Sequence, residues 1–222
     1  MKAARTAAWA LRAGLAMALL TISCARPGPA PAPAIDPRLA ALAPEDANAL
    51  AGLDLAALRA SPLGAKLPRV AGDARYALIA VRGREVATMT LGADGKVAGG
   101  AGVPRRGRSA LLAEAEKLAG QAPVWAVIRG GTELPLDGNL ANLNNLLRDV
   151  ETVTVAAHAG DRLTAEVEAA CPTAESARRF EGSLRAVLVL LKMAPASGVQ
   201  RKERKVRARV VAPEEWVAGL VR

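Results

Sequence analysis

Two alternating runs decide the fold of this chain, VETVTVAAH (150–158) and RLTAEVEA (162–169). In each run apolar and polar residues alternate with a period of two, which is typical of a strand with one buried face and one solvated face. A Gly-Asp pair lies between the two runs and favours a tight turn. The sequence therefore predicts an antiparallel hairpin in which Val167 faces a core, while Glu166 and Glu168 face water.

The segments around this hairpin have patterns of their own. After Thr173, which is a good N-cap residue, an apolar stripe that includes Phe180 and Leu184 recurs at helical spacing. The alternating run KVRARVV (205–211) predicts a further strand. The other elements expected in this half are a strand at 124–129, a helix at 139–148 and a short helix around Trp216.

The first half of the chain repeats this order of elements. We expect a strand at 48–55, a helix after it, a hairpin at 76–91 and a helix at 109–120. The order strand, helix, hairpin, helix is close to that of ferredoxin-like folds. The sequence thus predicts an α+β fold of two tandem βαββα (ferredoxin-like) units with mainly antiparallel sheet, at 44–122 and 123–222, which arose by internal duplication.

The N-terminus has the composition of an export signal. Basic residues without any acidic residue accompany an uncharged apolar run at 13–22, which is too short to span a bilayer. Residues 1–23 are therefore predicted to be a signal peptide, oriented by positive charge held on the cytoplasmic side. The alternative is that these residues form the N-terminal helix of a cytosolic domain.

Residues 19–25, LLTISCA, resemble the lipobox of bacterial lipoproteins, although Thr21 stands where a leucine is usual. The resemblance implies cleavage before Cys24 and acylation of its thiol. Because Ala25 rather than Asp follows the cysteine, it also implies transfer to the outer membrane. Cleavage after Ala25 by ordinary signal peptidase is the alternative, since Ser23 and Ala25 give the small side chains that this enzyme requires.

A stretch rich in Pro and Ala follows Cys24. Each proline fixes its own φ angle and lacks a backbone donor, so such a stretch does not pack as helix or sheet. We expect residues 24–43 to be a flexible tether between a lipid anchor and the folded part. The segment PEDANALAGLDLAALRASPLGAKL (44–67) resembles the corresponding part of uncharacterised bacterial envelope proteins, a resemblance that implies no activity.

Charge and aromatic content bear on nucleic acid as a partner. The formal net charge is +9, and loss of residues 1–23 removes Lys2, Arg5 and Arg12 and leaves +6. Binding of single strands without sequence preference needs aromatic stacking platforms. The chain has only 3 Trp, 1 Tyr and 1 Phe, and Trp9 lies in the signal peptide. We therefore expect no nucleic-acid partner, and a basic nucleic-acid-binding protein is the least favoured alternative.

Familiar catalytic and metal-binding patterns are missing from the sequence. His158 is the single histidine, and Cys171 is the only cysteine besides Cys24, so no zinc-ligand spacing occurs. Ser109 and Ser183 lack the G-x-S-x-G context of a nucleophile elbow. We expect no catalytic residue, no metal and no cofactor; the alternative is an envelope enzyme whose site follows none of these patterns.

Two polar patterns are candidates for binding. Three amides recur every three residues on the expected helix: Asn139, Asn142 and Asn145. Amides both donate and accept, so an exposed row of them can bind a glycan or a peptide. Three cations alternate with apolar residues and form one outward row on the last strand: Lys205, Arg207 and Arg209. This row either contacts an anionic surface or, on an edge strand, prevents pairing with another chain.

Together these patterns predict a non-enzymatic, exported envelope lipoprotein that acts as a binding or assembly module. The N-terminal lipid is its expected contact with the membrane. The expected partners are anionic lipid or another envelope protein, at the outer membrane or at a membrane surface that faces the periplasm.

Overall fold

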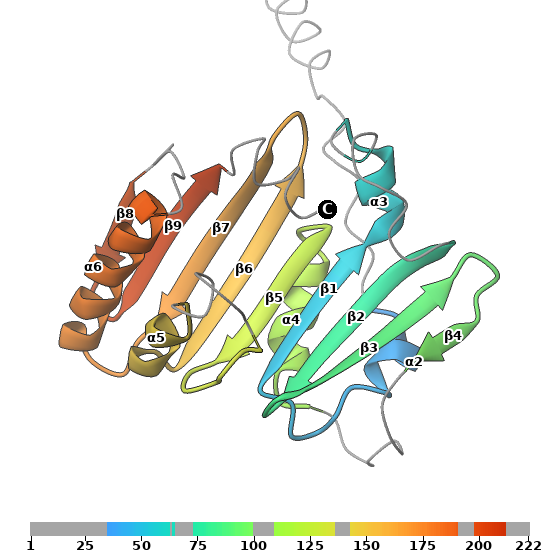
Figure 1. Cartoon of the computed structure of the whole chain (residues 1–222), viewed down its shortest axis with the longest axis horizontal. Coiled ribbons are helices and arrows are strands. Elements are labelled where there is room, and N and C mark those ends of the chain that lie inside the picture. The colour runs from blue at the N-terminus through green and yellow to red at the C-terminus, as the bar shows by residue number, and fades with distance from the viewer. Residues whose placement is uncertain are drawn as a thin grey trace, which may run out of the picture. The chain divides into compact units, whose positions relative to one another are not determined.

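All described strands belong to one open antiparallel sheet (Figure 1). The computed structural model of this chain describes residues 35–62, 64, 73–99, 109–135, 143–190 and 198–211. These residues all lie in one compact unit, Ala32–Arg222. The nine strands follow the order β4-β3-β2-β1-β5-β6-β7-β9-β8. The predicted α+β class with mainly antiparallel sheet is confirmed.

The bounds of the elements are as follows. The strands are β1 (Ala49–Asp54), β2 (Ala74–Arg82), β3 (Glu85–Gly92), β4 (Val97–Gly99), β5 (Val124–Arg129), β6 (Thr152–Ala159), β7 (Leu163–Ala170), β8 (Val199–Lys202) and β9 (Lys205–Val211). The helices are α2 (Pro37–Ala40), α3 (Leu55–Ala60), α4 (Leu112–Ala119), α5 (Leu143–Leu146) and α6 (Ala174–Leu190), with a turn of 3-10 helix, Leu147–Asp149, after α5.

Most elements lie where the sequence predicts them. β5 and β9 have the predicted bounds, and α6 begins directly after Thr173, whose hydroxyl accepts a hydrogen bond from the Ser176 backbone N–H at 3.0 Å. β8 is not predicted by the sequence. Of the helix expected at 139–148, residues 139–142 lie outside the described part. The rest is observed as α5 and the 3-10 turn. The short helix expected around Trp216 also lies outside the described part.

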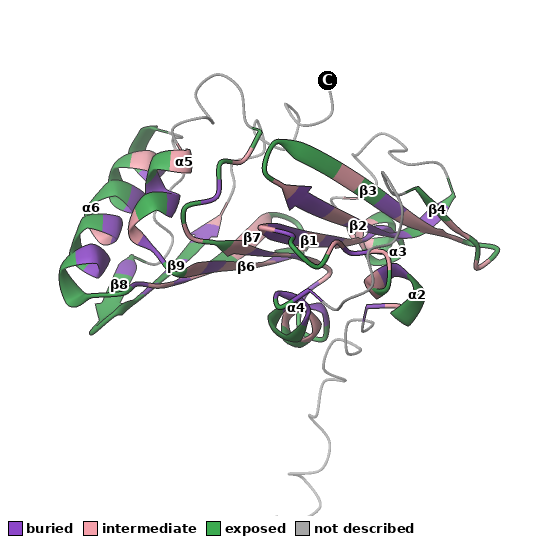
Figure 2. Ribbon diagram, turned by 90° about the horizontal axis from the view of Figure 1, so that it is seen from below, coloured by how far each residue is buried: buried purple, intermediate pink, exposed green. Residues whose placement is uncertain are grey.

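The two halves of the sheet are covered on opposite faces, as Figure 2 shows for α4 and α6. On one face Leu112 of α4 packs in a cluster with Leu50 of β1 and Leu78 of β2. On the other face Phe180 of α6 packs in a separate cluster that includes Val206 of β9, together with residues of α5. Each half therefore has its own apolar core. Among the described residues, no helix packs over β6, β7 and β9 on the face where α4 lies.

The folded part starts earlier than the sequence predicts. Leu39 of α2 is fully buried in the core beside α4. The helix begins here because Asp36 accepts a hydrogen bond from the backbone N–H of Arg38 at 2.9 Å and Pro37 takes the first helical position. The prediction of a tether over 24–43 is therefore wrong from residue 35 onward, and its earlier residues lie outside the described part.

The strand connections differ from the expected ferredoxin-like units. In a split βαβ arrangement the first two strands run parallel, with another strand between them. Here β1 pairs directly with β2, and β5 pairs directly with β6, both antiparallel. A direct antiparallel partner leaves no place for an inserted strand, so the ferredoxin-like connection is not observed. What recurs is the order strand, helix and hairpin, in β1-α3-β2-β3 and in β5-α5-β6-β7.

Trp125 organises the centre of the sheet. Its indole N–H donates a hydrogen bond to the Tyr76 hydroxyl at 2.9 Å, and both side chains are buried. The indole lies against Gly52 of β1, where a Cβ atom would collide with the indole ring and with the Tyr76 hydroxyl. Only glycine at position 52 lets the ring approach the backbone so closely. β1, β2 and β5 are thereby fixed to one another by side chains as well as by backbone hydrogen bonds.

We expect Tyr76 to resist ionisation. Burial raises the pKa of Tyr76 to about 12; the hydrogen bond from Trp125 acts against this rise, and the negative charge of Asp54 adds to it. An unfolded tyrosine has a pKa of about 10. Below a pH of about 10 the phenol is neutral in both states, and the contribution of its burial to the free energy of unfolding is fully present. The contribution is lost as the pH rises towards the folded pKa.

A spectroscopic titration tests this expectation. Tyr76 is the only tyrosine of the chain, so the ultraviolet absorbance of tyrosinate reports this residue alone. The expected midpoint lies near 12 or coincides with alkaline unfolding. A midpoint at the ordinary tyrosine pKa, in protein that circular dichroism shows to be folded, would contradict the buried position.

Candidate functional site

The open face of the second half is the candidate site. Along β6, β7 and β9 the alternate apolar side chains pack in the α6-side core, so the polar side chains between them point to the opposite face. We call this surface the charged face. Its members are exposed or half-buried and come from four neighbouring strands: Thr154, Ala156, Glu166, Glu168, Gln200, Lys202, Lys205, Arg207 and Arg209.

Strand register places carboxylates opposite guanidinium groups on the charged face. Glu166 lies opposite Arg209, and Glu168 lies opposite Arg207. Arg207 Nε donates to Glu168 Oε2 at 2.7 Å, and Lys205 Nζ donates to Glu168 Oε1 at 3.1 Å. Opposite charges in facing positions stabilise a sheet by about 0.2–1 kcal/mol a pair. The ion pairs of Glu168 with Arg207 and Lys205 therefore add little to the free energy of unfolding, but they fix the orientation of these side chains.

Glu168 is held in its ionised form. Partial burial is the largest single influence and by itself would raise the pKa of Glu168. The hydrogen bonds from Arg207 and Lys205, together with their positive charge, outweigh burial and lower the pKa of Glu168 below its ordinary value. The charged face therefore presents fixed charges of both signs at neutral pH.

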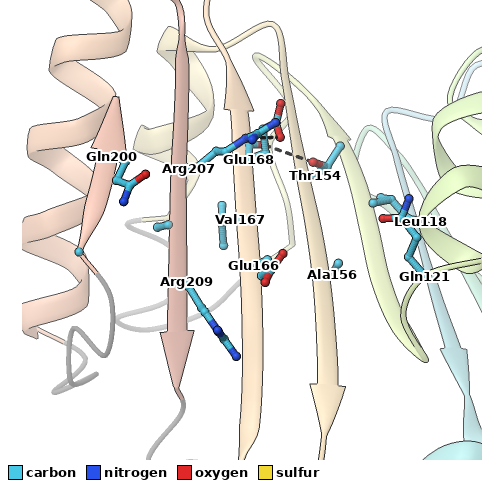
Figure 3. Close-up of a pocket in the computed structure, with 12 residues that line it drawn as sticks. Leu118, Gln121, Thr154, Ala156, Glu166, Val167, Glu168, Gln200, Arg207 and Arg209 are labelled. Atoms are coloured by element: carbon cyan, nitrogen blue, oxygen red, sulfur yellow. Dashed lines mark hydrogen bonds and ion pairs between the residues drawn. The ribbon is translucent and has the colours of Figure 1, made fainter. Parts of the chain in front are cut away.

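A groove of about 400 Å³ lies between the charged face and α4 (Figure 3). Leu118 of α4 and Gln121 just beyond that helix line one side, and Arg207 and Arg209 line the other. The remaining lining residues are Thr154, Ala156, Glu166, Val167, Glu168, Gly198, Gln200 and Ala208. The lining thus offers carboxylates, guanidinium groups, amides and a hydroxyl, which together can pair with both donors and acceptors of a ligand.

β9 carries the basic row that the sequence predicts. Lys205, Arg207 and Arg209 are exposed, and the residues between them are buried. The interpretation of this strand as an edge is wrong, because β8 pairs with β9 on the side away from β7. Glu168 is missed as the partner of two of these cations, since it lies 37 residues before Lys205 and meets it only through the pairing of β7 with β9.

The predicted row of amides is described only in part. Asn139 and Asn142 lie outside the described residues, and Asn145 is exposed on α5. Sequence reasoning missed a role for Asn144, whose side chain accepts from the Leu134 N–H and donates to the Leu134 carbonyl, both at 2.9 Å. This bidentate contact holds the segment after β5 against α5. No local pattern indicates it, because the two residues are ten apart.

The two cysteines have different outcomes. Cys24 lies outside the described residues. Cys171 is a buried free thiol, and burial, with the negative charges of Asp149 and Glu151, raises the pKa of Cys171. A raised pKa keeps the thiol protonated and unreactive.

His158 is exposed at the end of β6, and within the described ranges no group of three or more potential ligands is placed to hold a metal ion.

No family model, curated protein or solved structure matches this chain. None of the described helices is long and apolar enough to cross a membrane. What the protein does must therefore be inferred from its own residues, above all from the charged face and the groove beside α4.

Proposed function

We propose that this protein is an exported lipoprotein of the bacterial envelope and that it acts as a non-enzymatic binding module. The N-terminal signal pattern and Cys24 support export and anchoring. The charged face, an ordered set of paired charges beside a groove of about 400 Å³, is the observation that supports binding. Side chains carried by paired strands are held precisely enough to recognise a partner.

The charge pattern favours another envelope protein over anionic lipid as the partner at this face. A membrane surface of one sign would attract Arg207 and Arg209 and repel Glu166 and Glu168. An extended polar segment of a protein can carry charges of both signs, so it can pair with the carboxylates of β7 and with the guanidinium groups of β9. The groove between the charged face and α4 has room for the side chains of such a segment.

The anchor is tested by replacing Cys24 with serine. We expect Cys24→Ser to move the protein from the membrane fraction to the soluble fraction, because the thiol that would carry the lipid is gone. Cys171→Ser is the control and should leave the protein in the membrane fraction. Membrane fractionation that Cys24→Ser leaves unchanged would exclude lipidation as the anchor.

The binding surface is tested by site-specific photo-crosslinking in intact cells. A photoreactive residue at Ala156, in the groove, is expected to give a discrete adduct, and one at Arg178, on the exposed side of α6, is expected to give none. Reversal of charge by Glu166→Lys and Glu168→Lys should remove most of the adduct from position 156. Adducts of equal yield from positions 156 and 178 would contradict binding at the charged face. An adduct from position 156 whose yield the charge reversal leaves unchanged would contradict it as well.

We further propose that the two halves of the sheet descend from one βαββ unit. In support, β1-α3-β2-β3 and β5-α5-β6-β7 share element order, and β1 and β5 are direct antiparallel neighbours from which the two hairpins extend outward. The unit does not include the second helix, since α4 and α6 cover opposite faces. Sequence profiles built separately for 49–92 and 124–170 should align with each other; profiles that do not align would argue against duplication.

A further inference from the structure

The tip of the β8–β9 hairpin gathers like charges in a way that does not favour its own folding. Lys202 of β8 lies directly opposite Lys205 of β9, on the charged face. Like charges in directly opposite positions destabilise a sheet. A neutral polar residue at either position would keep the strand soluble without this repulsion, so the pair has no evident structural purpose.

The turn that joins the two strands has residue types that are unusual for its backbone conformation. Only Glu203 and Arg204 lie between β8 and β9. Glu203 has a φ of 52°, and among the described residues it is the only one other than glycine with a positive φ. Two-residue hairpin turns with positive φ normally contain Asn, Asp or Gly. The turn thus places Glu203 at a position that a residue more tolerant of a positive φ would occupy more easily.

A cavity of about 580 Å³ lies at this tip. Five of its lining residues are cations: Arg201, Lys202, Arg204, Lys205 and Arg207. The other lining residues are Glu151, Ala170, Cys171, Gln200 and Glu203. With two carboxylates against five cations, the lining itself is strongly positive.

Some of these cations have acidic partners in the structure, and others do not. Arg201 Nε is 3.0 Å from Glu181, and Lys205 and Arg207 share Glu168. Arg204 donates to the neutral Pro172 carbonyl at 3.5 Å. For Lys202, no described carboxylate lies within 4.0 Å. The turn therefore keeps a surplus of positive charge even when Glu203 is counted, because it carries Lys202 and Arg204 and lies beside Lys205.

We propose that this cavity binds a phosphate group, with Lys202, Lys205 and Arg204 as its contacts. Phosphate carries up to two negative charges, so it would remove the repulsion between the two lysines, and the planar guanidinium of Arg204 can donate two parallel hydrogen bonds to it. The cavity shares Gln200 and Arg207 with the groove, but its three proposed contacts do not line the groove. The phosphate group can belong to a lipid headgroup or to a soluble phosphate ester.

Thermal unfolding of the full chain in inorganic phosphate tests the site. At matched ionic strength, phosphate is expected to raise the melting temperature above its value in chloride, because a ligand that binds only the folded state stabilises it. Lys202→Glu should abolish this rise. The same substitution gives Lys205 an opposite charge, so the melting temperature in chloride should stay equal or increase, which shows that the variant is folded.

Lys96→Glu is the matched control, because it makes the same change of charge at an exposed lysine in the turn between β3 and β4, near the other edge of the sheet. It should keep the full phosphate effect. Equal melting temperatures in phosphate and chloride would overturn the proposal. A phosphate effect that survives Lys202→Glu would overturn it as well.

Vesicle sedimentation then separates the two sources of phosphate. Binding to phosphatidylglycerol vesicles that inorganic phosphate displaces, and that Lys202→Glu weakens at least tenfold, assigns the site to a lipid headgroup. Phosphate-dependent stabilisation without any vesicle binding assigns it to a soluble ester. The chain used in this assay carries Cys24→Ser, so that vesicle binding reports the folded part and not a lipid anchor.

Discussion

Replacement of Trp125 by alanine is expected to lower the free energy of unfolding by about 3–5 kcal/mol. The indole is 1% exposed and packs in the core under α4. Its removal leaves a cavity between Gly52 and α4, and it also removes the hydrogen bond to the buried Tyr76 hydroxyl. Both effects act on the three central strands, so they should appear as global destabilisation.

Urea unfolding followed by circular dichroism measures this effect. Trp125→Phe removes the indole N–H and the five-membered ring but keeps a six-membered ring in the core, so it creates a smaller cavity than alanine; we expect it to cost about 1–3 kcal/mol. Tyr76→Phe should couple with it, since each change removes the same hydrogen bond. A loss below about 1 kcal/mol for Trp125→Ala would contradict a close-packed position.

Replacement of Gly130 by alanine is expected to destabilise the fold by about 3 kcal/mol. A Cβ atom at position 130 would overlap the carbonyl oxygen of Val150. This obstacle is backbone and cannot rotate away as a side chain can. The same region is tied by the hydrogen bond from the Gly130 N–H to the Glu151 carbonyl at 2.8 Å, which the substitution would strain.

Gly182→Ala is the control for the glycine-to-alanine change itself. Gly182 lies within α6, and a Cβ atom there meets no other atom within 4 Å. Alanine is favoured over glycine inside a helix by about 0.5–1 kcal/mol, so this variant should be more stable than the native chain. If the two variants had similar midpoints in urea, the contact of Gly130 with Val150 would not be present in solution.

The bounds of most strands in the second half could be predicted from the sequence, whereas the order of the strands in the sheet could not. The apolar run VWAVIR gives the bounds of β5. The alternation in KVRARVV gives the bounds of β9, because a strand with one buried face imposes a period of two on its residues. β8 escapes this test because only Val199 of its four residues is buried. Strand order depends on contacts between distant segments, which explains why the ferredoxin-like connection was expected and not found.

The start of the fold shows a competition between two local signals. Proline-rich composition predicts an extended tether up to residue 43, whereas Asp36 and Pro37 together form a helix start. Burial of Leu39 decides in favour of the helix, and burial is a property of the assembled core. The same holds for the charged face. The cations of β9 are visible in the sequence, but their pairing with Glu168 requires β7 and β9 to lie side by side.

The position of β1 between β2 and β5 has a consequence for how the protein is made. A ribosome releases the first four strands before β5, so β1 is complete at residue 54 but does not receive its second partner until residues 124–129 emerge. In that interval β1 is paired with β2 on one side only, and its other side is an open edge of the kind that recruits a foreign strand. Slow passage through this stage favours association between incomplete chains, and a holding chaperone would act on it there.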